Sequence, residues 1–194
     1  LFSRFTEEDK EKVSKIIRSF TSEIIEILRD SDGLREIGIR GDCVYAIYTT
    51  PLQSDTYECV DKATYINTYL KMLNNLLALK KYPTIAVGIG VGTAEELIVK
   101  AGRKDVGINN PVWIGDAVTG ASNLSAIANK DGHPPIAFSD LTYANTIEKI
   151  KEINSEKDVD RWFTKYSDDK LGTYYCANIV KELFNDWIDG GMKE

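Results

Sequence analysis

The chain has 194 residues, of which 43% are hydrophobic and 28% are charged, and its formal net charge is −6. This size and composition indicate one folded domain with a hydrophobic core. The acidic balance argues against a nucleic-acid-binding groove. No apolar run approaches the ~20 residues of a membrane helix, and no basic-then-apolar leader opens the sequence. We therefore expect a cytoplasmic protein that contacts neither nucleic acid nor membrane.

Cysteine and histidine are sparse. The three cysteines, Cys43, Cys59 and Cys176, show no metal-binding spacing, which favours reduced thiols over a disulfide framework. His133 is the single histidine and precedes two prolines in a predicted loop. Its position predicts a surface role and argues against a histidine-based triad or a zinc site.

The first half of the chain predicts a helix, a hairpin and a second helix. Residues 6–28 begin with Thr6 as a cap, continue through an acidic first turn, and then carry apolar residues at helical spacing. Residues 36–50 read as two strands that meet at a tight turn, Arg40-Gly41-Asp42. The second helix is expected over residues 57–81.

The second half predicts shorter elements. We expect strands at 84–91, 97–101 and 112–114, a polar loop at 102–111, a helix at 117–129, a strand at 134–138, a small helix capped by Ser139, a charged linker or helix end at 149–158, a hairpin of 160–166 with 173–178, and a final helix carrying Leu183 and Trp187. This alternation of helices and hairpins favours an α+β sandwich, with helices against a largely antiparallel sheet.

The Arg40-Gly41-Asp42-Cys43 turn places a carboxylate at the tip of a hairpin. Such a carboxylate is suited to Mg²⁺, a hard ion that takes oxygen ligands and also binds substrate phosphates. The alternative is that Asp42 only suits the geometry of the turn.

Glycines occupy every second position of the strand that ends at Gly92, namely Gly88, Gly90 and Gly92. One strand face therefore carries no side chains, so a ligand, a helix or another subunit must approach it. The spacing is not that of a dinucleotide fingerprint, because no helix start follows.

Residues 113–124 read as the entry and first turns of a helix. Thr119 and Asn123 are four apart and share one helix face, as site residues or as solvated positions. Asp116 is expected to be the N-cap. Another face of the helix carries small residues that permit close packing: Ala117, Gly120 and Ala121.

In this order, the Gly41-Asp42 turn, the glycine strand and the Ile-Gly-Asp-Ala-Val helix entry resemble the catalytic domain of class III nucleotidyl cyclases. The resemblance covers roughly residues 36–178, and the helix entry looks closer to bacterial pyrimidine cyclases of Pycsar antiphage defence than to animal adenylyl cyclases. It implies a ferredoxin-like, palm-type sandwich, with residues 1–194 as a single catalytic domain whose first strand is expected before residue 1.

The resemblance also implies two divalent ions per site, Mg²⁺ or Mn²⁺. Asp42 matches the second of the family's two metal-binding aspartates. No carboxylate in this sequence matches the first, since Glu7, Glu8 and Asp9 look like helix-start acids.

The family's transition-state pair, an asparagine and an arginine four residues later, corresponds here to Thr119 and Asn123. Both depart from the pattern, and Asn123 brings no charge. Arg40 and Lys170 are candidate replacements or solvated charges. Lys170 lies in the loop where the family often places a triphosphate-binding lysine.

Purine cyclases that read adenine use a lysine and an aspartate, each three residues before a landmark glycine. The corresponding positions here are Gly38 and Val112, and neither side chain can hydrogen-bond a base. A site without those polar partners cannot discriminate a base by them. The substitution favours a pyrimidine nucleotide, UTP or CTP.

The resemblance thus implies conversion of UTP or CTP to a 3′,5′-cyclic monophosphate and pyrophosphate by a head-to-tail homodimer. A separate cyclic-nucleotide-dependent effector would read the product in antiphage signalling. The alternatives are an adenylate or guanylate cyclase with unusual base contacts, and a degenerate cyclase-like domain that binds a nucleotide without turnover.

Overall fold

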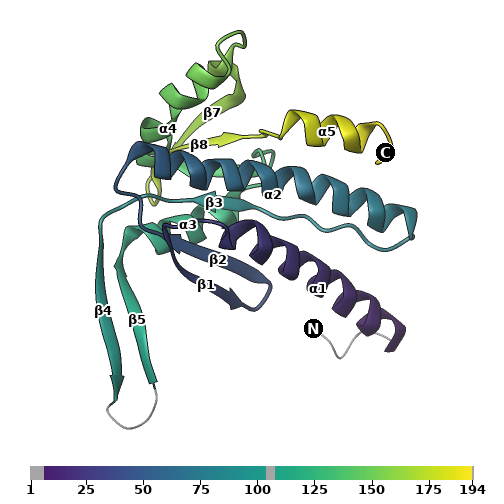
Figure 1. Cartoon of the computed structure of the whole chain (residues 1–194), viewed down its shortest axis with the longest axis horizontal. Helices are drawn as coiled ribbons and strands as arrows, with labels where there is room; N and C mark the ends of the chain where they lie inside the picture. The colour runs from purple at the N-terminus through teal and green to yellow at the C-terminus, as the bar shows by residue number, and fades with distance from the viewer. Residues whose placement is uncertain (1–6, 104–107, 194) are drawn as a thin grey trace.

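The computed structural model describes residues 7–103 and 108–193 and has an α+β architecture (Figure 1). Its helices are α1 (Glu7–Arg29), α2 (Gln53–Leu79), α3 (Asp116–Ile127), α4 (Asp140–Ile153) and α5 (Glu182–Asp189), with a 3₁₀ helix at Val159–Trp162. Its strands are β1 (Leu34–Arg40), β2 (Cys43–Tyr48), β3 (Ile89–Val91), β4 (Glu96–Arg103), β5 (Ile108–Gly115), β6 (Ile136–Ser139), β7 (Phe163–Asp168) and β8 (Gly172–Ala177). No helix in these described ranges is long and apolar enough to cross a membrane.

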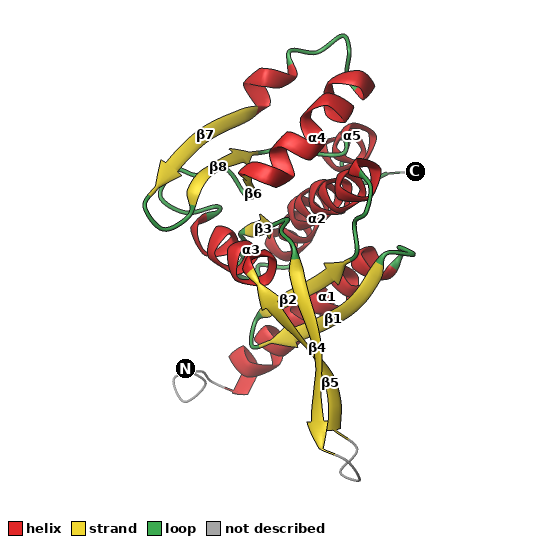
Figure 2. Cartoon of the chain, turned by 90° about the vertical axis from the view of Figure 1, so that its left-hand side faces the viewer, coloured by secondary structure: helices red, strands yellow, loops and turns green. Residues whose placement is uncertain are grey.

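The strands form one four-stranded sheet and two separate hairpins. The sheet has the order β3-β6-β8-β7, in which only the β3–β6 pair is parallel. The β1–β2 and β4–β5 pairs are antiparallel ribbons. The β4–β5 ribbon projects from the body as an arm (Figure 2). The largely antiparallel pairing agrees with the sequence-based prediction.

Helix α2 lies at the centre of the hydrophobic core and is covered on two sides. Toward its N-terminal half, Val60 and Ala63 pack with the buried residues of β6 and α4. Further along, Leu70 and Leu73 pack with Ile16 and other residues of α1. Burial on both sides makes α2 the element against which the sheet and α1 are positioned.

The bare face of the glycine strand is covered by α3 of the same chain. A Cβ at Gly90 would lie 2.0 Å from the carbonyl oxygen of Ala121, and one at Gly88 would lie 2.3 Å from that of Ser125. At Gly92 the nearest atom is the Ala117 carbonyl oxygen, at 2.8 Å. A helix is therefore the element that the alternating glycines accommodate.

The predicted small-residue face of α3 is correct for Ala117 and Ala121 and wrong for Gly120. Apart from its two chain neighbours and the backbone of its own helix, no described atom lies within 4 Å of a Cβ built at Gly120. Ser125 takes its place in the contact with the glycine strand.

The predicted strand at 84–91 is reduced to Ile89–Val91. Upstream of it, the side-chain amide of Asn74 hydrogen-bonds both the N–H and the C=O of Ile85, each at 2.9 Å. A side chain thus satisfies the backbone groups that a neighbouring strand was expected to pair.

The predicted polar loop at 102–111 is wrong, because most of it forms the arm. Gly102 pairs with Asn109 and Lys100 with Pro111 in the β4–β5 ladder. Backbone pairing across the hairpin outweighs the polar composition of the segment.

Helix α2 begins at Gln53, four residues before the predicted start. Just before it, Asp55 accepts a hydrogen bond from the Leu52 N–H.

Substitution of Gly90 by Ala tests the contact between β3 and α3. The new methyl group would overlap backbone atoms, which cannot rotate away, so we expect a loss of about 2 kcal/mol or more in unfolding free energy. Urea denaturation measures it. Gly120→Ala is the matched control: its site is open and helical, so it should stabilise by about 0.5–1 kcal/mol. Equal effects of the two substitutions would contradict the close approach.

Candidate active site

Asp42 lies at the exposed tip of the β1–β2 ribbon, as predicted from the sequence. Gly41 adopts a φ of 65°, which a glycine reaches without strain, and Arg40 pairs with Cys43 at the end of the ladder. Arg40 is also exposed. The turn therefore presents one carboxylate and one guanidinium to solvent.

Asp42 is the one carboxylate that this turn offers to a metal ion. Within residues 7–103 and 108–193, no group of three or more His, Cys, Asp or Glu side chains is placed to hold a metal. Mg²⁺ is commonly held by one or two carboxylates together with substrate phosphates, and Asp42 supplies such an oxygen ligand. Glu7, Glu8 and Asp9 form the first turn of α1, in agreement with their predicted role as helix-start acids.

The structure brings together Asn123 and Lys170, which are 47 residues apart in sequence. Asn123 is partly buried on α3, and Lys170 lies in the exposed turn between β7 and β8. The Lys170 Nζ donates a hydrogen bond to the Asn123 Oδ1 at 3.2 Å. The Asp168 carboxylate shapes this turn by accepting the backbone N–H groups of Lys170 and Leu171, at 2.8 and 2.6 Å. An ammonium group is thus held beside the α3 face that carries Thr119 and Asn123.

The N-cap of α3 is Gly115, so the predicted cap role of Asp116 is wrong. Glu96 of β4 lies opposite Gly115 in the arm and accepts the N–H of Ala117 at 2.5 Å. A Cβ at Gly115 would lie 2.7 Å from the Glu96 carboxylate, so the glycine leaves room for it. The Glu96 Oε2 is buried and has no hydrogen-bond partner among the described residues. A carboxylate from the arm therefore caps the helix and complements its positive N-terminal end.

Gly38 lies beneath an aromatic ring. It pairs with Tyr45 across the ribbon, and a Cβ at Gly38 would lie 2.3 Å from the Tyr45 Cζ and Oη atoms. The Tyr45 hydroxyl donates to the Glu36 Oε1 at 2.7 Å, and the Trp113 Nε1 donates to the Glu36 Oε2 at 2.8 Å. The hydrogen bond to Glu36, with some desolvation, raises the pKa of Tyr45.

The sequence reasoning missed Glu36 and Tyr45. One sequence pattern could have revealed Tyr45: in the predicted hairpin, Gly38 in the middle of the first strand faces the aromatic Tyr45 on the second. Val112 is 42% exposed, and strand alternation directs it to the opposite face of β5 from Trp113. Trp113, not Val112, is the arm residue that meets the β1–β2 ribbon.

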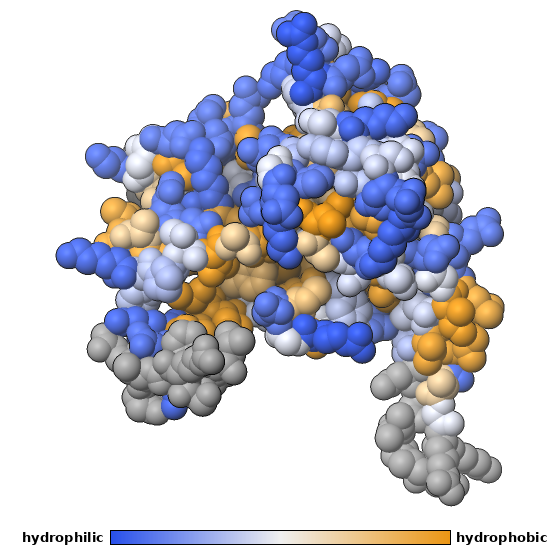
Figure 3. Space-filling view, turned by 180° about the vertical axis from the view of Figure 1, so that it is seen from behind, coloured by the Kyte–Doolittle hydropathy of each residue, from blue (hydrophilic) through white to orange (hydrophobic). Residues whose placement is uncertain are grey.

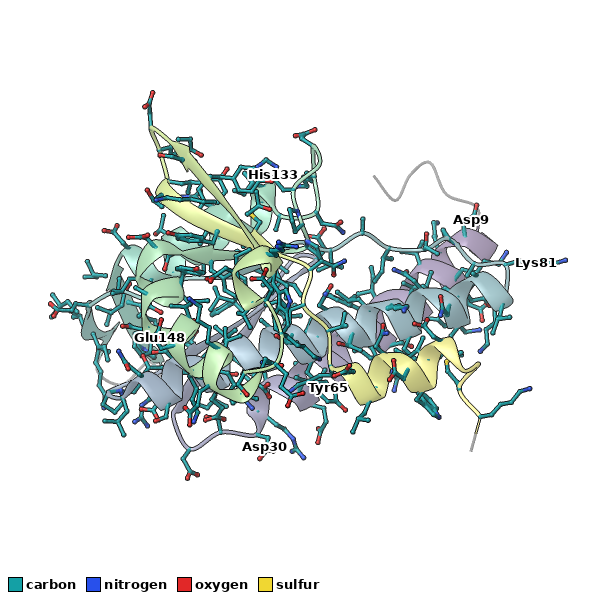
Figure 4. The ribbon with its side chains drawn as sticks, turned by 90° about the horizontal axis from the view of Figure 1, so that it is seen from above. Asp9, Asp30, Tyr65, Lys81, His133 and Glu148 are labelled. Atoms are coloured by element: carbon teal, nitrogen blue, oxygen red, sulfur yellow. The ribbon has the colours of Figure 1, made fainter. Side chains whose placement is uncertain are left out.

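His133 belongs to an aromatic cluster beside the β7–β8 hairpin (Figure 4). Its ring is partly buried, lies 4.4 Å from the centroid of Tyr166, and places Nε2 3.3 Å from the Tyr174 hydroxyl. These contacts give it a packing role.

Two of the three thiols are unsuited to nucleophilic chemistry. Burial raises the pKa of Cys59 to about 12 and that of Cys176 to about 11. Both of these thiols stay protonated near neutral pH.

Comparison with known proteins relates the chain to nucleotidyl cyclases. No family model matches it. A uridylate cyclase of Treponema porcinum is 54% identical over 188 residues, which cover 97% of this chain and 63% of the relative. A uridylate cyclase of Gulbenkiania mobilis is 26% identical over 184 residues, which cover 91% of this chain and 71% of the relative.

Among solved structures, the guanylyl cyclase Cya2 matches with a TM-score of 0.64 and 16% identity, over 91% of this chain and 85% of that one. The chain shares the fold of this guanylyl cyclase and is similar in sequence to two proteins named uridylate cyclase. The resemblance stated from the three sequence motifs is confirmed, as is the α+β cyclase fold.

Substitution of Glu96 by Ala tests the cap of α3. Removing the acceptor leaves the Ala117 N–H without its partner, and we expect a loss of about 1 kcal/mol in unfolding free energy. Thermal and urea unfolding measure it. Glu95→Ala, at the exposed neighbouring position, should change stability by less than about 0.5 kcal/mol. If both variants behave alike, Glu96 is not the cap.

Proposed function

We propose that this chain is the catalytic domain of a pyrimidine nucleotidyl cyclase that converts UTP to 3′,5′-cyclic UMP and pyrophosphate. The observation that carries the proposal is the 54% identity, over 97% of the chain, to a protein named uridylate cyclase. The chain spans 63% of the length of that relative. The Asn123–Lys170 pair favours turnover over a degenerate binding domain, because an ammonium group compensates for the uncharged Asn123.

In the proposed reaction the ribose 3′-hydroxyl loses its proton to water and its oxygen attacks the α-phosphorus. The bond to the pyrophosphate oxygen breaks, leaving its electron pair on pyrophosphate. Divalent ions bound through Asp42 would neutralise the triphosphate and stabilise the attacking and leaving oxygens. The Lys170 ammonium stabilises the negative charge that develops on the phosphate oxygens. The Asn123 carbonyl oxygen accepts from Lys170, so its NH₂ group remains to donate to a phosphate oxygen. Thr119 adds a hydroxyl one turn earlier, and Arg40 adds a positive charge beside Asp42.

The proposed enzyme works as a head-to-tail homodimer. Among the described residues, no hydrogen bond joins Asp42 to α3, which fits a site completed by a second copy. The arm supports this arrangement because its large apolar side chains face solvent, including Leu97, Val99 and Ile114 on one face of the ribbon, with exposed fractions of 62%, 40% and 53%. They form an apolar patch on the arm (Figure 3), and such patches mark association surfaces.

The proposed role in the cell rests on the resemblance alone. We propose that the cyclic product is read by a separate cyclic-nucleotide-dependent effector in antiphage signalling. We propose a cytoplasmic location for the enzyme, because its substrate is a nucleoside triphosphate.

Complementation between inactive variants tests the metal residue and the dimer together. Asp42→Ala and Lys170→Ala should each lose most of the cyclic UMP formed from UTP with Mn²⁺. Mixed and allowed to exchange subunits, they should recover about a quarter of the wild-type rate, because half the dimers carry one intact site of two. Recovery of no activity, with each variant folded and dimeric, would contradict a shared site. Formation of no cyclic product by the unmodified protein would contradict the proposed function.

The charge on Lys170 is tested by conservative replacement. We expect Lys170→Ala to lower kcat about 100-fold, in the range of a removed electrostatic donor, and Lys170→Arg to keep a larger share of it. Steady-state cyclisation of UTP measures both variants. Lys165→Ala, on the same hairpin and exposed, is the control and should stay near the wild-type rate. A Lys170→Ala enzyme with unchanged kcat would exclude Lys170 from the site.

A further inference from the structure

We propose that Asp168 is a positioning residue of the reaction, because its carboxylate fixes the backbone from which Lys170 presents an ammonium group to the triphosphate. This inference rests on the proposed function, in which Lys170 stabilises the charge on the phosphate oxygens, and adds the residue that holds Lys170 in place. It concerns the turn between β7 and β8, which lies beside α3 (Figure 2).

The Lys170 side chain is weakly held by its own contacts. Lysine carries its charge on a flexible four-carbon stem, and Lys170 is exposed. In residues 7–103 and 108–193 its Nζ has one hydrogen-bond partner, the Asn123 Oδ1 at 3.2 Å, and no carboxylate forms an ion pair with it. One bond to a neutral acceptor leaves the ammonium group free to turn, so its direction has to be set by the backbone.

Asp168 sets that direction with a single oxygen atom. Its Oδ1 accepts the N–H of Lys170 at 2.8 Å and the N–H of Leu171 at 2.6 Å. An aspartate that accepts N–H groups two and three residues further along closes a local turn of the chain. The peptide groups on both sides of the Lys170 Cα are therefore tied to one atom, which fixes the direction in which the lysine side chain leaves the chain.

The same turn is anchored at its far end. Gly172 pairs with Asp168 across the hairpin and has a φ of 67°, which lets the chain turn back into β8 without strain. Leu171 packs against the buried cluster that includes Leu124, the residue after Asn123 on α3. The backbone of Lys170 thus lies between the Asp168 carboxylate and an apolar contact with the helix that carries Asn123.

The neighbouring carboxylate shows that the contact is specific to position 168. Asp169 is exposed and has no hydrogen bond or ion pair within the part of the chain that the structure describes. A negative charge beside a triphosphate is repulsive, so the use of Asp168 lies in the two N–H groups that it accepts. The amide oxygen of an asparagine can accept the same two groups, whereas an alanine accepts neither.

A double-mutant cycle with Lys170 separates positioning from a merely structural role. We expect Asp168→Ala to lower the kcat of UTP cyclisation about 10-fold, because a misplaced reacting group costs up to about 100-fold in rate. Asp168→Asn should restore the rate to within about twofold of the wild type, because it keeps the acceptor. In the Lys170→Ala background, Asp168→Ala should change kcat by less than about twofold, because no ammonium group remains to be positioned.

Three results would overturn the proposal. The first is an equal loss in Asp168→Ala and Asp168→Asn, which would assign the effect to the charge. The second is the same fold loss from Asp168→Ala with and without Lys170, which would show a structural effect. The third is an unchanged kcat in Asp168→Ala. Asp169→Ala removes the adjacent carboxylate and is the matched control, which should keep the wild-type rate. If Asp168→Ala fails to fold by circular dichroism, Asp168→Glu replaces it, because it moves the acceptor by one methylene group and should cause a similar loss.

Binding of a nucleotide that cannot cyclise separates this inference from the proposed activity. The 3′-deoxy form of UTP lacks the attacking hydroxyl, and isothermal titration with Mn²⁺ measures its affinity in the same cycle of variants. A loss of affinity in Asp168→Ala that disappears in the Lys170→Ala background, without cyclisation of UTP by the wild-type protein, would support the proposal and contradict only the proposed function. Cyclisation of UTP with no coupling between the two residues would contradict only the proposal. Absence of both binding and cyclisation would overturn both.

Discussion

The close approach of α3 to β3 is the contact on which the geometry of the candidate site depends. A Cβ at Gly90 would lie 2.0 Å from the Ala121 carbonyl oxygen, so the two backbones are closer than a side chain at position 90 would allow. The parallel β3–β6 pair ties β3 into the sheet, and β8 joins the same sheet next to β6. The helix and the β7–β8 turn therefore both lie against one sheet, and Lys170 reaches Asn123 across it.

The second restraint on α3 comes from outside that frame. Glu96 caps the helix from the arm, and the arm also contacts the β1–β2 ribbon through the Trp113–Glu36 hydrogen bond. The arm thus touches both the element that carries Asn123 and the ribbon that carries Asp42. Any partner that binds the apolar patch on the arm acts on a segment in contact with both elements of the proposed site.

Most of the fold could be predicted from local patterns, as could the positions from which the candidate site is built. Each of three features spans only a few consecutive residues, so the sequence alone predicts it: the Gly41 turn, the helix entry after Gly115 and the alternating glycines. The sequence could not show whether a ligand, a helix or another subunit covers the glycine face, because tertiary packing decides which partner approaches it. The full length of the arm could not be predicted for the same reason. Gly102 and Asn109 are typical loop residues, and only their backbone pairing makes them part of the ribbon. Glu36 gave no signal of its own, because its importance comes from Tyr45 across the ribbon and from Trp113, 77 residues away.

The proposed activity of this chain is the cyclisation of a pyrimidine nucleotide. Its most direct test is competition: the protein is incubated with equimolar ATP, GTP, CTP and UTP and Mn²⁺, and the cyclic products are identified by mass spectrometry. We expect cyclic UMP as the dominant product. A cyclic purine nucleotide as the main product, or no cyclic product of any kind, would contradict it.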